Sequence, residues 1–223
     1  TRYGKDLYGE YKLVELLRGY NSLGMPLDRL TAREYTEFLQ GGYTIVDSAD
    51  AFKSAMAVKS QAEIKNISLA CSATDKAFLQ LLGEIKEGMT ENEVAALLEY
   101  LMRKNGASGT SFSTICAFGA NGSVPHHETG TAKLRFGDAV LLDFGCKING
   151  YCSDCTRTFL FGDDGKHAEF KDIYDKVLTA HMLVKQNFHS GMTGKQGDAI
   201  ARDYLETQGL AKYFTHSLGH SLG

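Results

Sequence analysis

A short pattern of residues occurs twice in the chain at a fixed interval, and this repeat is the feature that most constrains the fold. The tripeptide Gly88-Met89-Thr90 recurs as Gly191-Met192-Thr193, 103 residues later, and Gly106 recurs as Gly209 at the same interval. In each copy a helix-like segment precedes the tripeptide, and a capped helix, a glycine and a candidate strand follow it. The matched order of elements indicates an internal duplication.

The helices of the two copies are expected from their capping boxes and apolar periodicity. Helices are predicted to begin at Ser60 and Thr90 in the first copy and to cover about 167–189 and 195–207 in the second. The inward faces that the helical period predicts are Ile64, Ile67, Cys71, Phe78 and Leu82 on the first helix, and Val94, Leu97, Leu98 and Leu101 on the next.

A β-hairpin carrying two aspartates follows the first pair of helices. After a strand at about 114–118, strands are predicted at 140–147 and 151–161, and Asn149-Gly150 is a strong two-residue turn signal between them. That turn makes Asp143 and Asp154 diagonal neighbours on one face, roughly 7 Å apart. Two carboxylates so placed repel unless a cation lies between them, and their separation suits two metal ions about 3.5–4 Å apart.

The second copy has no such hairpin within the 223 residues. The chain also begins with Thr1 rather than methionine. We therefore expect a truncated sequence, or a processed product of a longer one.

Composition excludes several classes of function. Lys and Arg together number 24 against 27 Asp and Glu, so nothing favours a nucleic-acid partner. No apolar run approaches the roughly 20 residues that span a bilayer. Five cysteines, an odd number, predict reduced thiols and a cytoplasmic location. A zinc site at Cys146, Cys152 and Cys155 is disfavoured because no second Cys or His pair lies at ligand spacing.

Residues 1–52 carry no recognisable chemistry. Leu13, Leu16 and Leu17 suit a short helix, Thr31 with Glu34 predicts a capped helix ending near Gly41, and residues 44–46 suit a brief strand.

The last eight residues, HSLGHSLG, allow two interpretations. Residues 219–223 match the G-x-S-x-G elbow of serine hydrolases, with Ser221 as nucleophile. Residues 213–216 make a poor buried strand to lead into such an elbow, which disfavours this alternative. His216 and His220, together with His126 in the Pro125-His126-His127 segment, instead predict a metal or proton-transfer site. We expect the final segment to be a strand of that site.

Four motifs resemble those of the pita-bread metallopeptidases, in the branch of the Xaa-Pro peptidases aminopeptidase P and prolidase. They are Pro125-His126, Leu142-Asp143-Phe144-Gly145, the segment SDCTRT at 153–158 and the segment HSLGHSLG at 216–223. The resemblance runs from about Ala51 to Gly223. It implies an α+β fold with a curved antiparallel sheet flanked by helices, an incomplete second half, the tail of an N-terminal domain at 1–52 and a partial catalytic domain at 53–223.

The resemblance also implies a site. Two divalent ions, manganese most often and otherwise cobalt or zinc, would activate a water for attack on the bond before proline. Asp143, Asp154 and His220 would be metal ligands, His126 would contact substrate or shuttle a proton, and His216 would lie behind the ligands or touch the substrate. The family's two glutamate ligands would lie beyond Gly223, so the fragment itself is expected to be inactive.

The expected partner is a proline-containing peptide, and the expected assembly is a homo-oligomer, a dimer. The alternative within the same fold is a non-catalytic binding protein. The presence of all three candidate ligands disfavours it.

Overall fold

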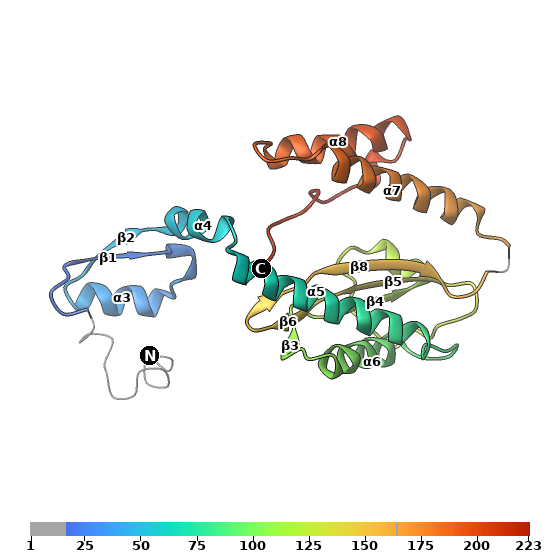
Figure 1. Cartoon of the computed structure of the whole chain (residues 1–223), viewed down its shortest axis with the longest axis horizontal. Coiled ribbons are helices and arrows are strands. Elements are labelled where there is room, and N and C mark those ends of the chain that lie inside the picture. Colours follow the sequence, from blue (N-terminus) through green and yellow to red (C-terminus); the bar gives the residue numbers. More distant parts are fainter. Residues whose placement is uncertain (1–16, 164) are drawn as a thin grey trace. The chain divides into compact units, whose positions relative to one another are not determined.

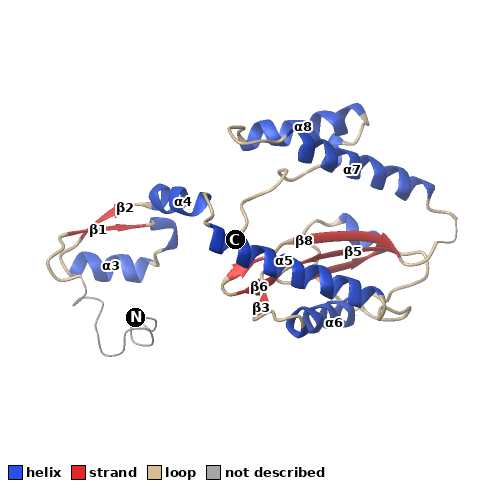
Figure 2. Cartoon of the chain, viewed as in Figure 1, coloured by secondary structure: helices blue, strands red, loops and turns tan. Residues whose placement is uncertain are grey.

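The computed structural model describes residues 17–163 and 165–223, and the expected helix positions Leu13 and Leu16 lie outside them. The chain divides into two compact units, Thr1–Lys59 and Ser60–Gly223. The expected domain division after residue 52 remains a prediction. Figures 1 and 2 show the helices and strands of both units.

Within its described residues, the first unit contains a short parallel strand pair and two helices. Strand β1 pairs with β2 in parallel, and α3 begins at the predicted capping box of Thr31 and Glu34. Its elements are β1 (Ser22–Met25), a 3-10 turn (Leu27–Arg29), α3 (Ala32–Gln40), β2 (Thr44–Asp47) and α4 (Ala49–Ala57).

The described residues of the second unit, 60–163 and 165–223, form antiparallel sheets and four helices. The strand orders are β4-β5-β8 and β3-β6-β7, and every pair is antiparallel. The helices are α5 (Gln61–Leu82), α6 (Glu91–Lys104), α7 (Ala168–Asn187) and α8 (Gly194–Thr207). The strands are β3 (Gly109–Thr110), β4 (Ile115–Phe118), β5 (Ala139–Phe144), β6 (Cys146–Ile148), β7 (Tyr151–Cys152) and β8 (Cys155–Leu160), and 3-10 turns lie at Gly119–Ser123 and Ala211–Tyr213.

The hairpin has the register that the Asn149-Gly150 turn predicts. Ile148 pairs with Tyr151, and Asp143 pairs with Thr156. Asn149 and Gly150 have φ values of 52° and 86°, as a type I′ turn requires at both central positions. The turn residues thus set the pairing of Asp143.

The main core lies between the sheet and the first two helices. Helices α5 and α6 pack on one face of β5, where Val140, Leu142 and Phe144 are buried (Figure 1). Because side chains alternate along a strand, Asp143 lies on the opposite face. The buried face therefore fixes which side of the sheet carries the carboxylate.

The predicted inward face of α5 is wrong at its two ends. Ile64 and Leu82 are exposed, whereas Phe78 packs against the core beside the buried residues Ala70, Ala73, Thr74, Ala77 and Leu81. Small side chains let the helix approach the sheet closely, and close packing outweighs the size of individual apolar residues. The face predicted for α6 is correct, with Val94, Leu98 and Leu101 buried and Leu97 packed against the core.

Helices α7 and α8 pack on each other around a second, smaller core. Ala180, Ala201 and Leu205 are its buried residues, and α8 begins at the predicted capping box of Thr193 and Gln196.

The strand expected at residues 216–223 is wrong, because the segment has no regular secondary structure. A strand requires a neighbour to form its hydrogen-bond ladder, and no described strand pairs with this segment.

No helix in the described part of the chain is both long and apolar enough to cross a membrane. All five cysteines are free thiols.

Candidate active site

Asp143 occupies a half-buried position on β5 with other titratable groups around it. Thr156 Oγ1 donates a hydrogen bond to Asp143 Oδ1 at 3.1 Å. Burial, and to a lesser degree the charge of Asp154, raise the pKa of Asp143, against the opposing effects of the Thr156 hydrogen bond and of His126 and His220. Asp143 therefore lies within electrostatic reach of three of the predicted site residues.

Asp154 and His220 are in direct contact. His220 Nε2 lies 3.2 Å from Asp154 Oδ2, and His220 Nδ1 lies 2.9 Å from the carbonyl oxygen of Ser221. A carbonyl can only accept a hydrogen bond, so Nδ1 carries a proton. In the neutral ring this leaves the Nε2 lone pair facing Asp154, which is the arrangement that a metal-binding histidine needs.

The donor set fits a divalent metal in chemical type. Two carboxylates and one imidazole are ligands that manganese, cobalt and zinc all accept. Nevertheless, no group of three or more His, Cys, Asp or Glu side chains within residues 17–163 and 165–223 lies close enough together to hold an ion. The candidate ligands are neighbours whose distances are not those of a coordinated centre.

A buried polar cluster holds the chain beside Asp154. Thr74 Oγ1 on α5 and Ser153 Oγ are within hydrogen-bond distance, and the Cys146 amide donates to Ser153 Oγ at 2.9 Å. Gly145 lies against this segment so closely that a Cβ there would overlap the Ser153 carbonyl. The position of Asp154 thus depends on Gly145 and on a buried pair of hydroxyls, one from Ser153 and one from Thr74 on α5.

Glu91 is a buried carboxylate whose importance the sequence analysis missed. It is the first residue of α6, and it is fully buried. Its carboxylate accepts hydrogen bonds from the amides of Phe118 and Gly130, from Asn121 Nδ2 and from His127 Nε2, all at 2.8–3.0 Å. In sequence it is one of two glutamates in the first turn, so nothing in the spacing separates it from an ordinary exposed residue.

The loop that follows β4 carries His126. Besides the hydrogen bonds to Glu91, Thr129 attaches this loop to the residues around the start of β4. Its hydroxyl donates to the Thr114 carbonyl at 3.0 Å and accepts from the Cys116 amide at 2.9 Å. His126 itself is exposed, whereas the side chain of His127 is 16% exposed. The two adjacent histidines therefore differ: His127 is bound to the protein interior and His126 faces solvent.

His216 belongs to a separate cluster on α8. Arg202 pairs with Asp198 at 2.7 Å and donates to the carbonyls of Phe214 and His216, and the Leu218 amide donates to Asp198. The backbone groups of Phe214, His216 and Leu218 thus bond to the side chains of Arg202 and Asp198 on α8 instead of to a neighbouring strand.

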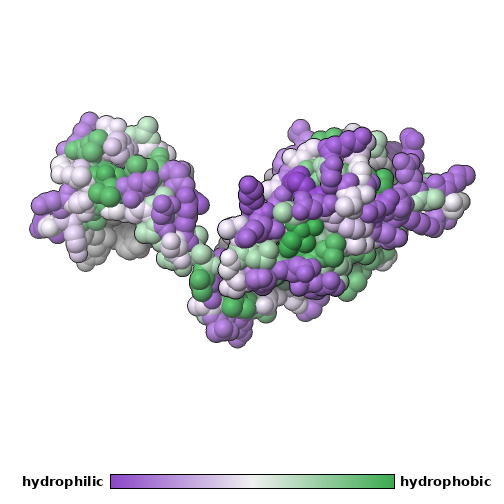
Figure 3. Space-filling model, turned by 90° about the horizontal axis from the view of Figure 1, so that it is seen from above, coloured by the Kyte–Doolittle hydropathy of each residue, from purple (hydrophilic) through white to green (hydrophobic). Residues whose placement is uncertain are grey.

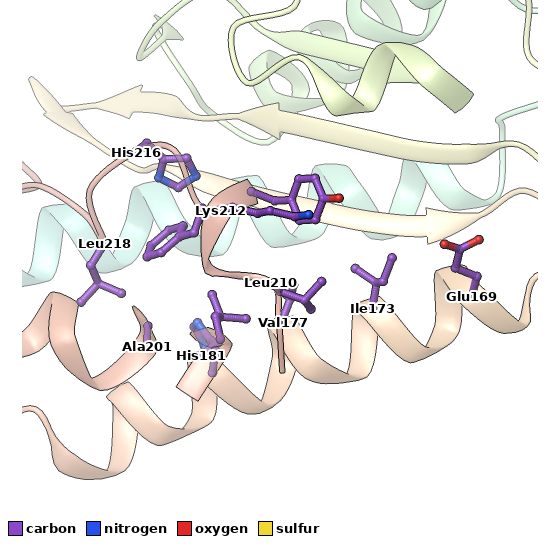
Figure 4. A pocket seen from close by; sticks show the side chains of 14 residues that line it. Glu169, Ile173, Val177, His181, Ala201, Leu210, Lys212, His216 and Leu218 are labelled. Carbon is purple, nitrogen blue, oxygen red and sulfur yellow. The ribbon is translucent and has the colours of Figure 1, made fainter. Parts of the chain in front are cut away.

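A groove of about 810 Å³ lies between α7, α8 and the turn at Ala211–Tyr213. Ile173 and Val177 project into it from α7, with His216 at its other end (Figure 4). His216 is the only one of the five predicted site residues that lines it, so the groove is separate from Asp143 and Asp154.

The structure therefore groups four of the predicted residues: Asp154 and His220 touch, and the charges of both, with that of His126, act on Asp143. It does not bring His216 into that group.

The chain is similar to known proteins in both sequence and structure. The chain is 40% identical over 174 residues to an Xaa-Pro dipeptidase of Pyrococcus horikoshii, a match that covers 78% of this chain and 49% of the relative. An X-Pro aminopeptidase structure from Thermotoga maritima superposes with a TM-score of 0.87 at 32% identity, over 95% of this chain and 60% of that one. Prolidase from Pyrococcus furiosus gives 0.85 at 35% identity, over 94% and 62%.

The chain thus spans about half the length of the dipeptidase, and the expected α+β pita-bread fold is confirmed. The model of metallopeptidase family M24 matches residues 65–223. The chain belongs to metallopeptidase family M24.

Proposed function

We propose that the protein is a metal-dependent peptidase that hydrolyses the bond before proline in Xaa-Pro peptides. The observation that carries the proposal is the contact between His220 Nε2 and Asp154, together with the influence of both residues on the pKa of the nearby Asp143. Relatives named Xaa-Pro dipeptidase, X-Pro aminopeptidase and prolidase support the substrate class.

Asp143, Asp154 and His220 would hold the metal, with manganese as the first candidate and cobalt or zinc as the others. When bound, divalent ions supply Lewis acidity and a reactive water near neutral pH. Thr156 keeps Asp143 oriented through its 3.1 Å hydrogen bond, and Ser221 keeps the lone pair of His220 on Nε2.

His126 would contact the substrate or transfer a proton. It is exposed, and it lies near enough to Asp143 for its charge to act on that carboxylate. His216 would act from outside the ligand group, where Arg202 and Phe214 hold its segment.

The test is an assay of the complete natural protein with manganese on an Xaa-Pro dipeptide and on a longer Xaa-Pro peptide, with metal analysis alongside. Turnover that a chelator removes and manganese restores is expected. Binding of peptide without turnover would instead indicate the non-catalytic alternative, and covalent labelling of Ser221 by a fluorophosphonate would indicate a serine hydrolase. Preference for the dipeptide or for the longer peptide decides between prolidase and aminopeptidase activity.

Three further properties belong to this proposal. The five free thiols support a reducing, cytoplasmic location. We assign residues 53–223 to the catalytic domain and 1–52 to the end of a preceding one.

Self-association as a dimer is supported by apolar side chains at the surface of the molecule, some of which appear in green in Figure 3. Those on α7 are Ile173, Tyr174, Val177, Leu178 and Met182. Sedimentation of the complete protein as a monomer would contradict the dimer.

A further inference from the structure

One buried carboxylate ties together both ends of the loop that carries His126. Glu91 Oε1 accepts from the Phe118 amide at 2.9 Å and from Asn121 Nδ2 at 2.8 Å. Glu91 Oε2 accepts from His127 Nε2 at 2.9 Å and from the Gly130 amide at 3.0 Å. Phe118 is the last residue of β4 and Gly130 lies twelve residues later, so a single side chain fixes the start, the middle and the end of the loop.

The attachment at His127 is the one adjacent in sequence to His126. Its ring is turned inward to Glu91, and the next residue back, His126, is exposed. Consecutive residues share a peptide plane, so an anchored His127 restricts where His126 can lie. A proton on His126 would lower the pKa of Asp143, so the ring lies in the neighbourhood of the candidate ligands.

We propose that Glu91 and His127 are positioning residues, which fix the loop 119–130 and thereby hold His126 at the proposed metal site. The expected effect on turnover rests on the proposed peptidase function. The anchoring of the loop by Glu91 and His127 does not. Neither Glu91 nor His127 touches the substrate or the metal; both act through His126.

The hydrogen bonds explain why a glutamate is required at position 91. The amide groups of Phe118, Gly130 and Asn121 are all donors, and His127 must donate as well, because an ionised carboxylate only accepts. A glutamine would place its NH₂ group against two of these donors whichever way it is turned. Glu91→Gln therefore breaks half of the attachment with almost no change of shape.

The experiment uses the complete natural protein loaded with manganese and four variants. Glu91→Gln and His127→Ala remove the attachment. His127→Gln is the conservative variant, since its side-chain amide can still donate to Glu91. Glu93→Gln is the matched control, because Glu93 lies in the same first turn and caps the helix but is exposed and has no bond to the loop.

Two kinds of measurement are made on each variant. In Glu91→Gln and His127→Ala, amide exchange in residues 119–130 should accelerate at least about tenfold while exchange in β5 and β8 is unchanged. The kcat for an Xaa-Pro peptide should fall by roughly 10- to 100-fold, as expected for a displaced catalytic group, with KM and bound metal within about twofold. His127→Gln should recover most of both losses, and Glu93→Gln should match the natural protein.

Several results would overturn the inference. Unchanged loop exchange in Glu91→Gln would show that the carboxylate does not hold the loop. An equal fall in kcat and an equal rise in loop exchange in His127→Gln and His127→Ala would show that no specific hydrogen bond from residue 127 to Glu91 is involved. Loss of metal in step with kcat would show that the variants do not act through His126. If Glu91→Gln does not fold, the two His127 variants decide. Failure of the natural protein to cleave any Xaa-Pro peptide would end the proposed function, while the exchange data would still test the attachment.

Discussion

The carboxylate of Glu91 lies 2.9 Å from Nε2 of His127, and the Glu91 side chain is completely buried. An ionised carboxylate is stable in such a place only if its charge is compensated by hydrogen bonds or a counter-charge. Burial raises the pKa of Glu91, but the hydrogen bonds from Asn121, His127 and two backbone amides outweigh it and hold the pKa below the usual glutamate value. The first turn of a helix and a loop 36 residues later are thus stabilised by one charged group.

Glu91→Gln should lower the free energy of unfolding by about 2–5 kcal/mol at neutral pH, because two buried donors lose their acceptor. The pKa of Glu91 is depressed in the folded state, so its contribution is present above the unfolded pKa of about 4.3 and is lost as the pH falls through the folded-state pKa. The difference between the variant and the natural protein should therefore shrink as the solution is acidified below about pH 4.3. Urea unfolding at several pH values measures this, and a difference that does not vary with pH would contradict it.

Gly145→Ala should strongly destabilise the second unit. The added Cβ would overlap the backbone carbonyl of Ser153 and also crowd Phe112, and a backbone atom cannot move aside as a flexible side chain can. A loss of about 3 kcal/mol or more is expected, in the range of overpacked core sites. The matched control is Gly122→Ala, whose Cβ would meet only ordinary contact with Leu141. Equal thermal stability of the two variants would show that the Gly145 segment relaxes freely.

Asp154→Asn should abolish hydrolysis of an Xaa-Pro peptide by the complete protein and reduce its metal content. Asparagine keeps the shape of the side chain but removes the charge that faces His220 Nε2. Metal analysis and turnover are measured together, with Asp172→Asn as control, since Asp172 is an exposed partner of Lys176 on α7. Full metal stoichiometry with normal turnover in Asp154→Asn would remove Asp154 from the ligand set.

His126→Ala should leave the metal content intact and reduce turnover by about 100-fold or more, the usual contribution of a proton-transfer group. His126 is exposed and makes its effect on Asp143 through charge, as a group outside the ligand set would. His189→Ala is the control, because His189 is an exposed histidine in the loop between α7 and α8. Loss of metal together with activity would place His126 among the ligands.

The 223-residue chain by itself should bind manganese weakly and show no turnover. It supplies three candidate ligands, and an ion in an oxygen-rich site with few protein ligands keeps more of its waters and binds more weakly. Metal titration and an assay with an Xaa-Pro dipeptide check both statements. Turnover by a preparation free of longer protein would show that these residues suffice and would overturn the mechanism.

The sequence was most informative where a local rule determined the structure. The turn residues Asn149 and Gly150 set the register of the hairpin, and that register places Asp143 opposite Thr156. The capping boxes at Thr31, Ser60, Thr90 and Thr193 begin their helices as predicted, because a cap needs only residues three positions apart.

Sequence reasoning failed where the structure depends on distant partners. The buried face of α5 is chosen by how closely alanines let it approach the sheet, which the helical period of the larger apolar residues cannot reveal. The segment at 216–223 was expected to be a strand, but its His216 carbonyl and Leu218 amide bond to Arg202 and Asp198 on α8 rather than to a strand.

The candidate site shows the same division. Motifs in the sequence named Asp143, Asp154, His126, His216 and His220, and their roles stay predictions. Only the tertiary structure separated His216 from the other four, and only it showed that Glu91 is a buried anchor for the loop before them. A sequence determines local geometry because turns, caps and strand alternation act over a few residues, whereas the burial of a charge depends on donors that folding brings from 27 to 39 residues away.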